Sequence, residues 1–142
     1  MTFTHRFRAT RRGLAPLLAA GVLALAGCAG LQPQTTEQLV QQRAQQRWDA
    51  LLAGDFAKAW TYTPASSRAR VKQDDYRDQF GRGGRWTAAT VKSVECAAER
   101  CTANVSLTAR LLIPGLQNQL TTGVVPEVWV REDGQWWYLP PL

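Results

Sequence analysis

The spacing of hydrophobic and polar positions changes once along the chain, near Trp86. Before that point, apolar residues recur three and four positions apart, as at Val40, Ala44 and Trp48, while glutamines fill the opposite positions. This spacing predicts an amphipathic helix that begins near Glu37 and ends at Gly54. Similar reasoning predicts a short helix that starts at Phe56 and stops before Pro64, and a third over residues 73–80.

From Trp86 onward the apolar residues alternate with polar ones, which is the period of a strand with one buried face. The expected strands are 86–96, 101–113, a third within 119–131 that Pro126 interrupts, and 136–139. The Asp-Gly pair within residues 132–135 indicates a tight hairpin turn. The sequence therefore predicts an α+β domain in which N-terminal helices precede a curved, four-stranded antiparallel sheet.

A separate apolar run covers residues 14–26 and follows four arginines, with no acidic residue before it. As a helix, this run would cover roughly 20 Å, which is short of the ~30 Å hydrocarbon core. The run closes on Leu25-Ala26-Gly27-Cys28, a small-residue cleavage site directly before a cysteine. The stretch resembles the signal peptide of bacterial lipoproteins, which implies cleavage after residue 27 and lipid attachment at Cys28. A twin-arginine export route is a further interpretation of the arginines.

This signal divides the chain into residues 1–27, a lipidated cysteine with a short tether over 28–36, and a folded domain over 37–142. It implies a cell-envelope protein that is anchored to a membrane and faces the periplasm. Ala29 follows the cysteine, and this favours the outer membrane over the inner one. Cleavage removes four arginines, so the net charge falls from +6 to about +2, and nucleic acid is not expected as a partner.

Two cysteines remain after lipidation, Cys96 and Cys101. An even remainder in an oxidising compartment predicts one disulfide, placed across the hairpin formed by residues 97–100. A metal site is the competing interpretation, but the sole histidine, His5, lies in the signal. We expect neither a metal nor a cofactor.

The run from Arg47 to Trp60, together with Thr61-Tyr62-Thr63-Pro64 and Arg68, resembles the opening of nuclear-transport-factor-2-like domains. In that superfamily a long helix ends in a Gly-Asp-aromatic turn, and a cone of antiparallel strands follows. The resemblance covers residues 37–139. Its members include steroid isomerases, cyclases, dehydratases, secretion-system scaffold subunits and binding modules, so the fold does not define an activity. No catalytic residue of the family can be placed on this chain.

The sequence offers two groups of candidate binding residues. Trp129, Trp136 and Trp137 lie on neighbouring expected strands, and at least one of the adjacent pair should face away from the helices. Arg82 and Arg85 flank a glycine-rich segment, which is either a plain loop or a cradle for an anion.

A carboxylate and a tyrosine inside the sheet could instead act as an acid–base pair. The candidate carboxylates are Asp49, Asp55, Asp74, Asp75 and Asp78, and the candidate phenols are Tyr62, Tyr76 and Tyr138. Each aspartate also has a plain structural interpretation as a helix cap or a solvated helix residue.

Taken together, these features predict an envelope lipoprotein with a non-enzymatic domain that binds a partner protein or a small apolar ligand, with a homodimer as a further option. The alternatives are a small isomerase or lyase, and a scaffold subunit of an envelope secretion assembly.

Overall fold

The structure, a computed structural model, describes residues 33–82, 86–111, 113–116 and 119–141. The described residues from Pro33 onward form one compact unit. The expected signal peptide and Cys28 therefore lie outside the described residues. Among the described residues, no helix has the length and apolar character needed to cross a membrane.

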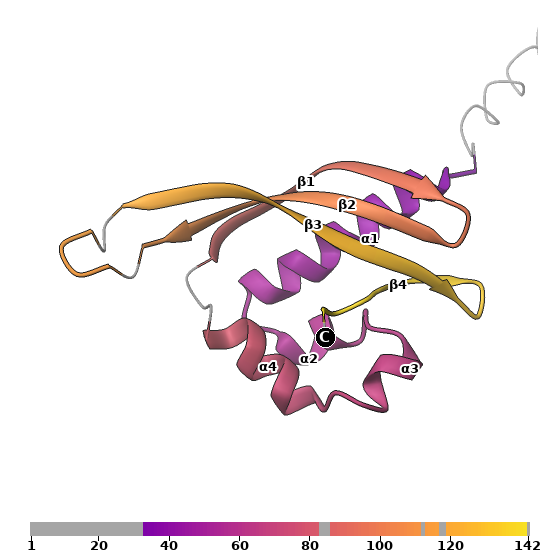
Figure 1. The fold of residues 1–142 in the computed structure, drawn as a ribbon, viewed down its shortest axis with the longest axis horizontal. Helices are drawn as coiled ribbons and strands as arrows, with labels where there is room; N and C mark the ends of the chain where they lie inside the picture. The colour runs from indigo at the N-terminus through magenta and orange to yellow at the C-terminus, as the bar shows by residue number, and fades with distance from the viewer. Residues whose placement is uncertain (1–32, 83–85, 112, 117–118, 142) are drawn as a thin grey trace, which may run out of the picture. The chain divides into compact units, whose positions relative to one another are not determined.

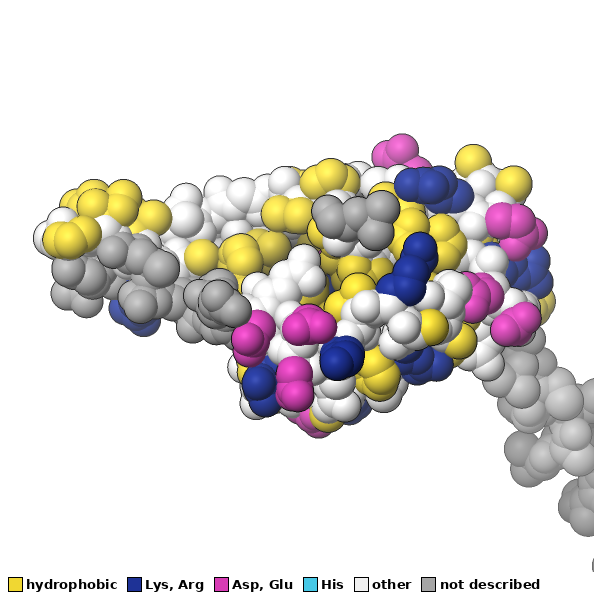
Figure 2. All heavy atoms as spheres, turned by 60° about the horizontal axis from the view of Figure 1, so that its bottom comes forward, with side chains coloured by type: hydrophobic (Ala, Val, Ile, Leu, Met, Phe, Trp, Pro, Cys, Tyr) yellow, Lys and Arg dark blue, Asp and Glu magenta, His cyan; other side chains and the backbone are white. Residues whose placement is uncertain are grey.

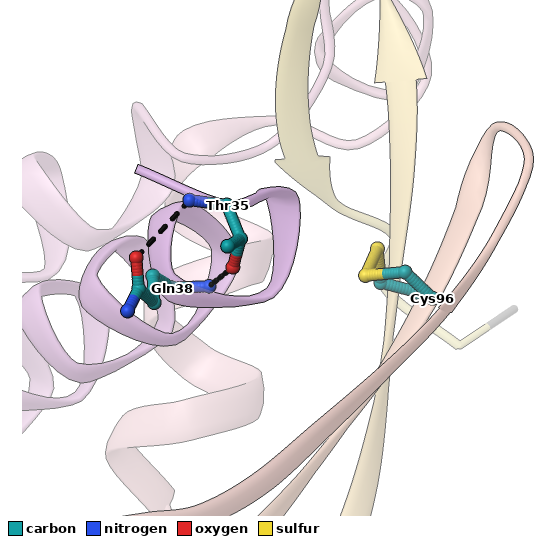
Figure 3. Close-up of a disulfide and its surroundings, with 4 residues drawn as sticks. Thr35, Gln38 and Cys96 are labelled. Carbon is teal, nitrogen blue, oxygen red and sulfur yellow. Dashed lines mark hydrogen bonds between the residues drawn. A yellow bond between two sulfur atoms is a disulfide. The ribbon is translucent and has the colours of Figure 1, made fainter. Parts of the chain in front are cut away.

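The first helix, α1 (Thr36–Leu52), begins at a capping box. The Thr35 hydroxyl accepts a hydrogen bond from the Gln38 backbone N–H, and the Gln38 side chain accepts one from the Thr35 N–H (Figure 3). Gly54 follows the C-cap Ala53, and its φ of 75° is the left-handed conformation that glycine adopts without strain. Both ends of the predicted helix are thus explained by local chemistry.

Three shorter helices follow, and one of them was not expected. They are α2 (Phe56–Trp60), α3 (Ala65–Arg68) and α4 (Gln73–Arg82). The Asp55 carboxylate caps α2 by accepting a hydrogen bond from the Lys58 N–H at 2.9 Å. The short helix α3 begins directly after Pro64, whose extended conformation suits the residue before a helix.

The four strands form one antiparallel sheet in the order β1-β2-β3-β4. Their bounds are β1 (Trp86–Ala97), β2 (Arg100–Arg110), β3 (Leu120–Glu132) and β4 (Gln135–Tyr138). The twisted sheet lies over α1, and the shorter helices lie beyond α1 (Figure 1). This arrangement confirms an α+β fold in which helices precede a four-stranded antiparallel sheet.

The expected interruption at Pro126 is wrong, because β3 runs through that residue. The Val128 carbonyl accepts a hydrogen bond from Leu139, so it points away from β2. Backbone groups alternate in direction along a strand, so Pro126, two residues earlier, points the same way. Its missing N–H therefore faces the open edge of β3, where no ladder bond is lost. The strand expected over 101–113 also ends early, at Arg110.

The core lies between α1 and one face of the sheet. Val40, Ala44 and Trp48 are at most 3% exposed, which confirms the predicted apolar face of α1. Alternate residues of β2 face them, including Ala103 and Val105, and both are fully buried. Burial of these two apolar surfaces against each other is the main term that holds the layers together.

Two tight turns fix the strand register. Cys96 and Cys101 lie directly opposite each other with their Cα atoms 4.0 Å apart, and a disulfide joins them (Figure 3). In the β3–β4 turn, Asp133 and Gly134 have φ values of 52° and 77°, the conformation of the predicted Asp-Gly hairpin. The predicted disulfide and hairpin turn are both present.

The outer edge of β1 is occupied by a side chain of α1. The Gln45 amide donates to the Ala89 carbonyl at 3.1 Å and accepts from the Val91 N–H at 3.1 Å. One side chain thus takes the place of a neighbouring strand at these two residues.

Candidate functional site

A buried ion pair links the first helix to the third strand. Arg47 Nη1 lies 2.7 Å from Glu127 Oε1, and the two side chains are 0% and 4% exposed. The same carboxylate oxygen accepts a hydrogen bond from Trp48 Nε1 at 2.9 Å. A charged pair this deep is retained only where both charges are compensated.

Aromatic rings surround the Arg47 guanidinium. Its central carbon lies 3.6 Å from the centre of the Tyr138 ring and 4.9 Å from that of Phe80. Its Nε donates to the Tyr76 hydroxyl at 3.0 Å. These contacts combine cation–π attraction with hydrogen bonding around a guanidinium that is itself fully buried. The side chain of Arg47 therefore fills the space between α1 and the sheet.

Burial raises the pKa of the ionisable side chains that surround Arg47. Burial raises the pKa of Glu127 above its ordinary value, and the neighbouring Arg47 opposes that shift. Burial also raises the pKa of Tyr76 and of Tyr138, again against the pull of Arg47. Two buried atoms of the ion pair, Arg47 Nη2 and Glu127 Oε2, have no hydrogen-bond partner of good geometry among the described residues.

Sequence reasoning missed both members of the ion pair, although the signal was present. Arg47 follows Ala44 by three positions and precedes Leu51 by four, so it occupies the apolar face of α1. Glu127 is two residues before the buried Trp129 and shares its face of β3. A charged residue on the buried face of a helix and one of opposite charge on the buried face of a strand predict an ion pair between the two residues.

Some of the candidate acid–base residues are buried and others are exposed. Tyr76 and Tyr138 lie in the interior, whereas all five aspartates are exposed. The interior carboxylate belongs to Glu127 instead. The five aspartates lie on the surface, which agrees with their structural interpretation, and Asp55 is a helix cap.

The three candidate tryptophans have different surroundings. Trp129 is fully buried and Trp136 is 5% exposed, so both belong to the core and are not available for surface recognition. Trp137 is half-buried, as expected for one member of the adjacent pair. Alternation along β4 explains the difference, because neighbouring residues of a strand face opposite sides.

Two arginines lie close to the Trp137 ring. The guanidinium of Arg43 is 5.3 Å from its ring centre and that of Arg68 is 5.6 Å away. The indole N–H donates to the Glu132 carbonyl at 3.0 Å. Trp137 is thus held by contacts of the domain itself.

Exposed apolar residues gather at the far end of the β2–β3 hairpin. Leu120 and Val124 are 55% and 61% exposed, and Ile113 in the connection is 54% exposed. Figure 2 shows apolar side chains at this end, which projects beyond the helices in Figure 1. Strand β4 pairs only with residues 129–132, so among the described residues no strand covers the edge of the earlier part of β3.

A cavity of about 450 Å³ lies elsewhere, beside the C-terminal segment. Its lining residues are Ser67, Arg70, Val71, Leu139, Pro140 and Pro141. The volume is within the range of small-molecule sites, and the lining combines apolar side chains with one guanidinium.

The glycine-rich candidate cannot be placed. Arg85 and the side chain of Arg82 lie outside the part of the chain that the structure describes. Within the described residues, no group of three or more His, Cys, Asp or Glu side chains could hold a metal ion.

Comparison with known proteins concerns the fold alone. The structure is similar to the solution structure of a SEC-C motif containing protein from Rhodopseudomonas palustris, with a TM-score of 0.52 and 14% identity. The match covers 68% of this chain and 71% of that one. No protein-family model and no curated protein sequence matches the chain. The class defined so far is therefore an α+β domain with a buried ion pair and an open strand edge.

Proposed function

We propose that this chain is a lipid-anchored lipoprotein of the bacterial envelope, and that its domain is a nuclear-transport-factor-2-like cone that binds a partner protein without catalysis. The proposal of an anchor rests on the cleavage pattern that ends at Cys28. The proposal of a cone rests on the helix-then-sheet order and on the run from Arg47 to Trp60.

The observation that carries the binding function is the open, apolar edge of β3. Natural sheets cover or charge such edges, because unpaired backbone groups on a strand attract other strands. From Gln119 to Pro126 the sequence has no charged residue, and Leu120 and Val124 are largely exposed. An uncharged edge with apolar side chains favours docking of another polypeptide.

The interior favours binding at the surface over an acid–base reaction inside the sheet. Glu127 Oε1 already accepts hydrogen bonds from Arg47 and Trp48. The guanidinium packs on Tyr138 at 3.6 Å, so it occupies the space between that ring and the carboxylate. A substrate would have to displace a buried charge, which costs several kcal/mol.

The proposed binding site can be tested with a photo-activated cross-linking residue at position 124 in the intact, lipidated protein. We expect cross-linked species from Val124 and none from Ser106, which lies directly across from it on the neighbouring strand β2. Equal cross-linking from both positions, or from neither, would refute the edge as the binding site.

The anchor has its own test. Cys28→Ala should release the protein from membranes while its circular dichroism and thermal transition stay unchanged. Release accompanied by unfolding would contradict the role of Cys28 as a tether.

The cavity supports a second candidate, a small apolar ligand. Its lining includes the Arg70 guanidinium among Val71, Leu139 and two prolines, which suits an apolar carboxylic acid. Octanoate should then bind more tightly than octanol, and Arg70→Gln should remove the difference. The matched control is Arg77→Gln, because Arg77 is an exposed arginine of α4 that is absent from the cavity lining.

A further inference from the structure

We infer that the occupant of the β3 edge is a second copy of this chain, added as an antiparallel strand to form one continuous sheet. This inference rests on the proposed function, because it names the partner that the same edge would bind. It follows from the direction of the backbone groups, from their self-complementary side chains and from the absence of charge.

The backbone groups of alternate β3 residues point away from β2. The Val128 carbonyl accepts from Leu139 N–H at 2.8 Å, on the side of β3 opposite to β2. By alternation, the N–H and C=O groups of Leu120, Thr122 and Val124 face the same side. Strand β4 pairs with β3 only from Trp129 onward, so in the part of the chain that the structure describes these groups have no neighbouring strand. They form a short ladder that is ready to accept another strand.

A two-fold axis at Thr122 makes this ladder complementary to itself. In that register Thr122 is opposite Thr122 of the second copy, and Leu120 is opposite Val124 of the second copy. Each of these is a pair that exchanges both backbone hydrogen bonds, since all three residues point their backbone groups outward. The apolar Leu120 and Val124 side chains then cover each other on one face of the joined sheet.

Identical strands can pair about a two-fold axis only where like charges do not meet. Residues 119–126 are uncharged, so self-pairing brings no repulsion. Glu127, the next residue, is directed into the core and bonded to Arg47. Pro126 and the Leu139 bond to Val128 limit the added strand to the segment before them. The edge therefore has the length, polarity and symmetry of an isologous interface.

Disulfide trapping tests the register directly. In the purified full-length mature protein, Thr122→Cys should yield a covalent dimer under mild oxidation, because the two-fold axis places the two introduced cysteines opposite each other. Ser106→Cys is the matched control: it lies on β2, opposite Val124, and should stay monomeric. Equal dimer yields from the two variants would overturn the proposed register.

Light scattering of the purified protein tests the interaction without a cysteine. Val124→Lys should weaken dimerisation at least tenfold, because each dimer would hold two lysines at the joined edge. Thr122→Pro removes an outward N–H and should do the same, while circular dichroism stays that of the native fold. A monomer at all concentrations would overturn the second copy as partner. If Val124 then still cross-links to a different envelope protein, the proposed binding function stands without this inference.

Discussion

Arg47 and Glu127 lie 80 residues apart in sequence, and their side chains meet at 2.7 Å in the buried core. The pair connects the middle of α1 to β3, at the residue where the buried part of β3 begins. Trp48 also donates to this carboxylate, so two consecutive helix residues bond to one side chain of the sheet. The register between helix and sheet is thus specified by polar as well as apolar contacts.

Glu127→Gln should destabilise the domain by about 3–5 kcal/mol, because it leaves the Arg47 charge buried without a counter-ion. Urea unfolding followed by tryptophan fluorescence measures the loss. The double variant Arg47→Met, Glu127→Met should be more stable than Glu127→Gln, since it buries no charge at all. An unchanged urea midpoint for Glu127→Gln would contradict a structural role for the pair.

Alkaline conditions should unfold the domain through its buried tyrosines. Burial raises the pKa of Tyr76 and Tyr138 above the ordinary value of about 10. A folded-state pKa above the unfolded one means that the stabilisation is complete below pH ~10 and is lost as pH rises through the folded pKa. The urea midpoint should therefore fall steadily above pH ~10. Tyr138→Phe should make this fall shallower, and an identical slope would count against the assignment.

The Cys96–Cys101 disulfide should stabilise the domain by about 2 kcal/mol, because it closes a short loop in the unfolded chain. Addition of a reductant should lower the thermal midpoint of the natural protein. The variant Cys96→Ser, Cys101→Ser should begin at that lower midpoint and show no response to reductant. A response in this variant would indicate that reductant acts elsewhere.

Gly134→Ala should cost about 1–2 kcal/mol, because the φ of 77° at this turn is unfavourable for a residue with a Cβ. Gly123→Ala is the control. Gly123 lies in β3 without a positive φ, and an added Cβ there would meet nothing within 4 Å. Thermal melts of the two variants should differ accordingly, and equal losses would show that strain at the turn is not the cause.

Local chemistry made most of the fold predictable. The cap at Thr35, the left-handed Gly54 and the Asp-Gly turn each depend on a few adjacent residues, so their sequence signals are strong. The path of β3 through Pro126 was not predictable in this way. A proline fits within β3 only if its missing N–H faces a side with no paired strand. That side is unpaired at Pro126 because β4 is short.

The candidate site was less predictable, because it joins residues that are distant in sequence. The sequence offered aspartates as candidate bases. The buried carboxylate of the described residues is instead that of Glu127, and its partner is an arginine. Trp129 and Trp136 were candidates for surface recognition, but both are buried in the core. The alternation of residues along a strand predicts which of them share a face. Which of the two faces is buried depends on contacts with the helices.

The Gln45 amide that bonds to Ala89 and Val91 has a consequence for assembly. Sheets that are open at both edges can add molecules without end and grow into fibrils. Here a side chain of α1 occupies the outer edge of β1 at these two residues, so another strand cannot pair with β1 there. Two-fold pairing at the β3 edge uses that edge of both molecules, so association through it would stop at two copies.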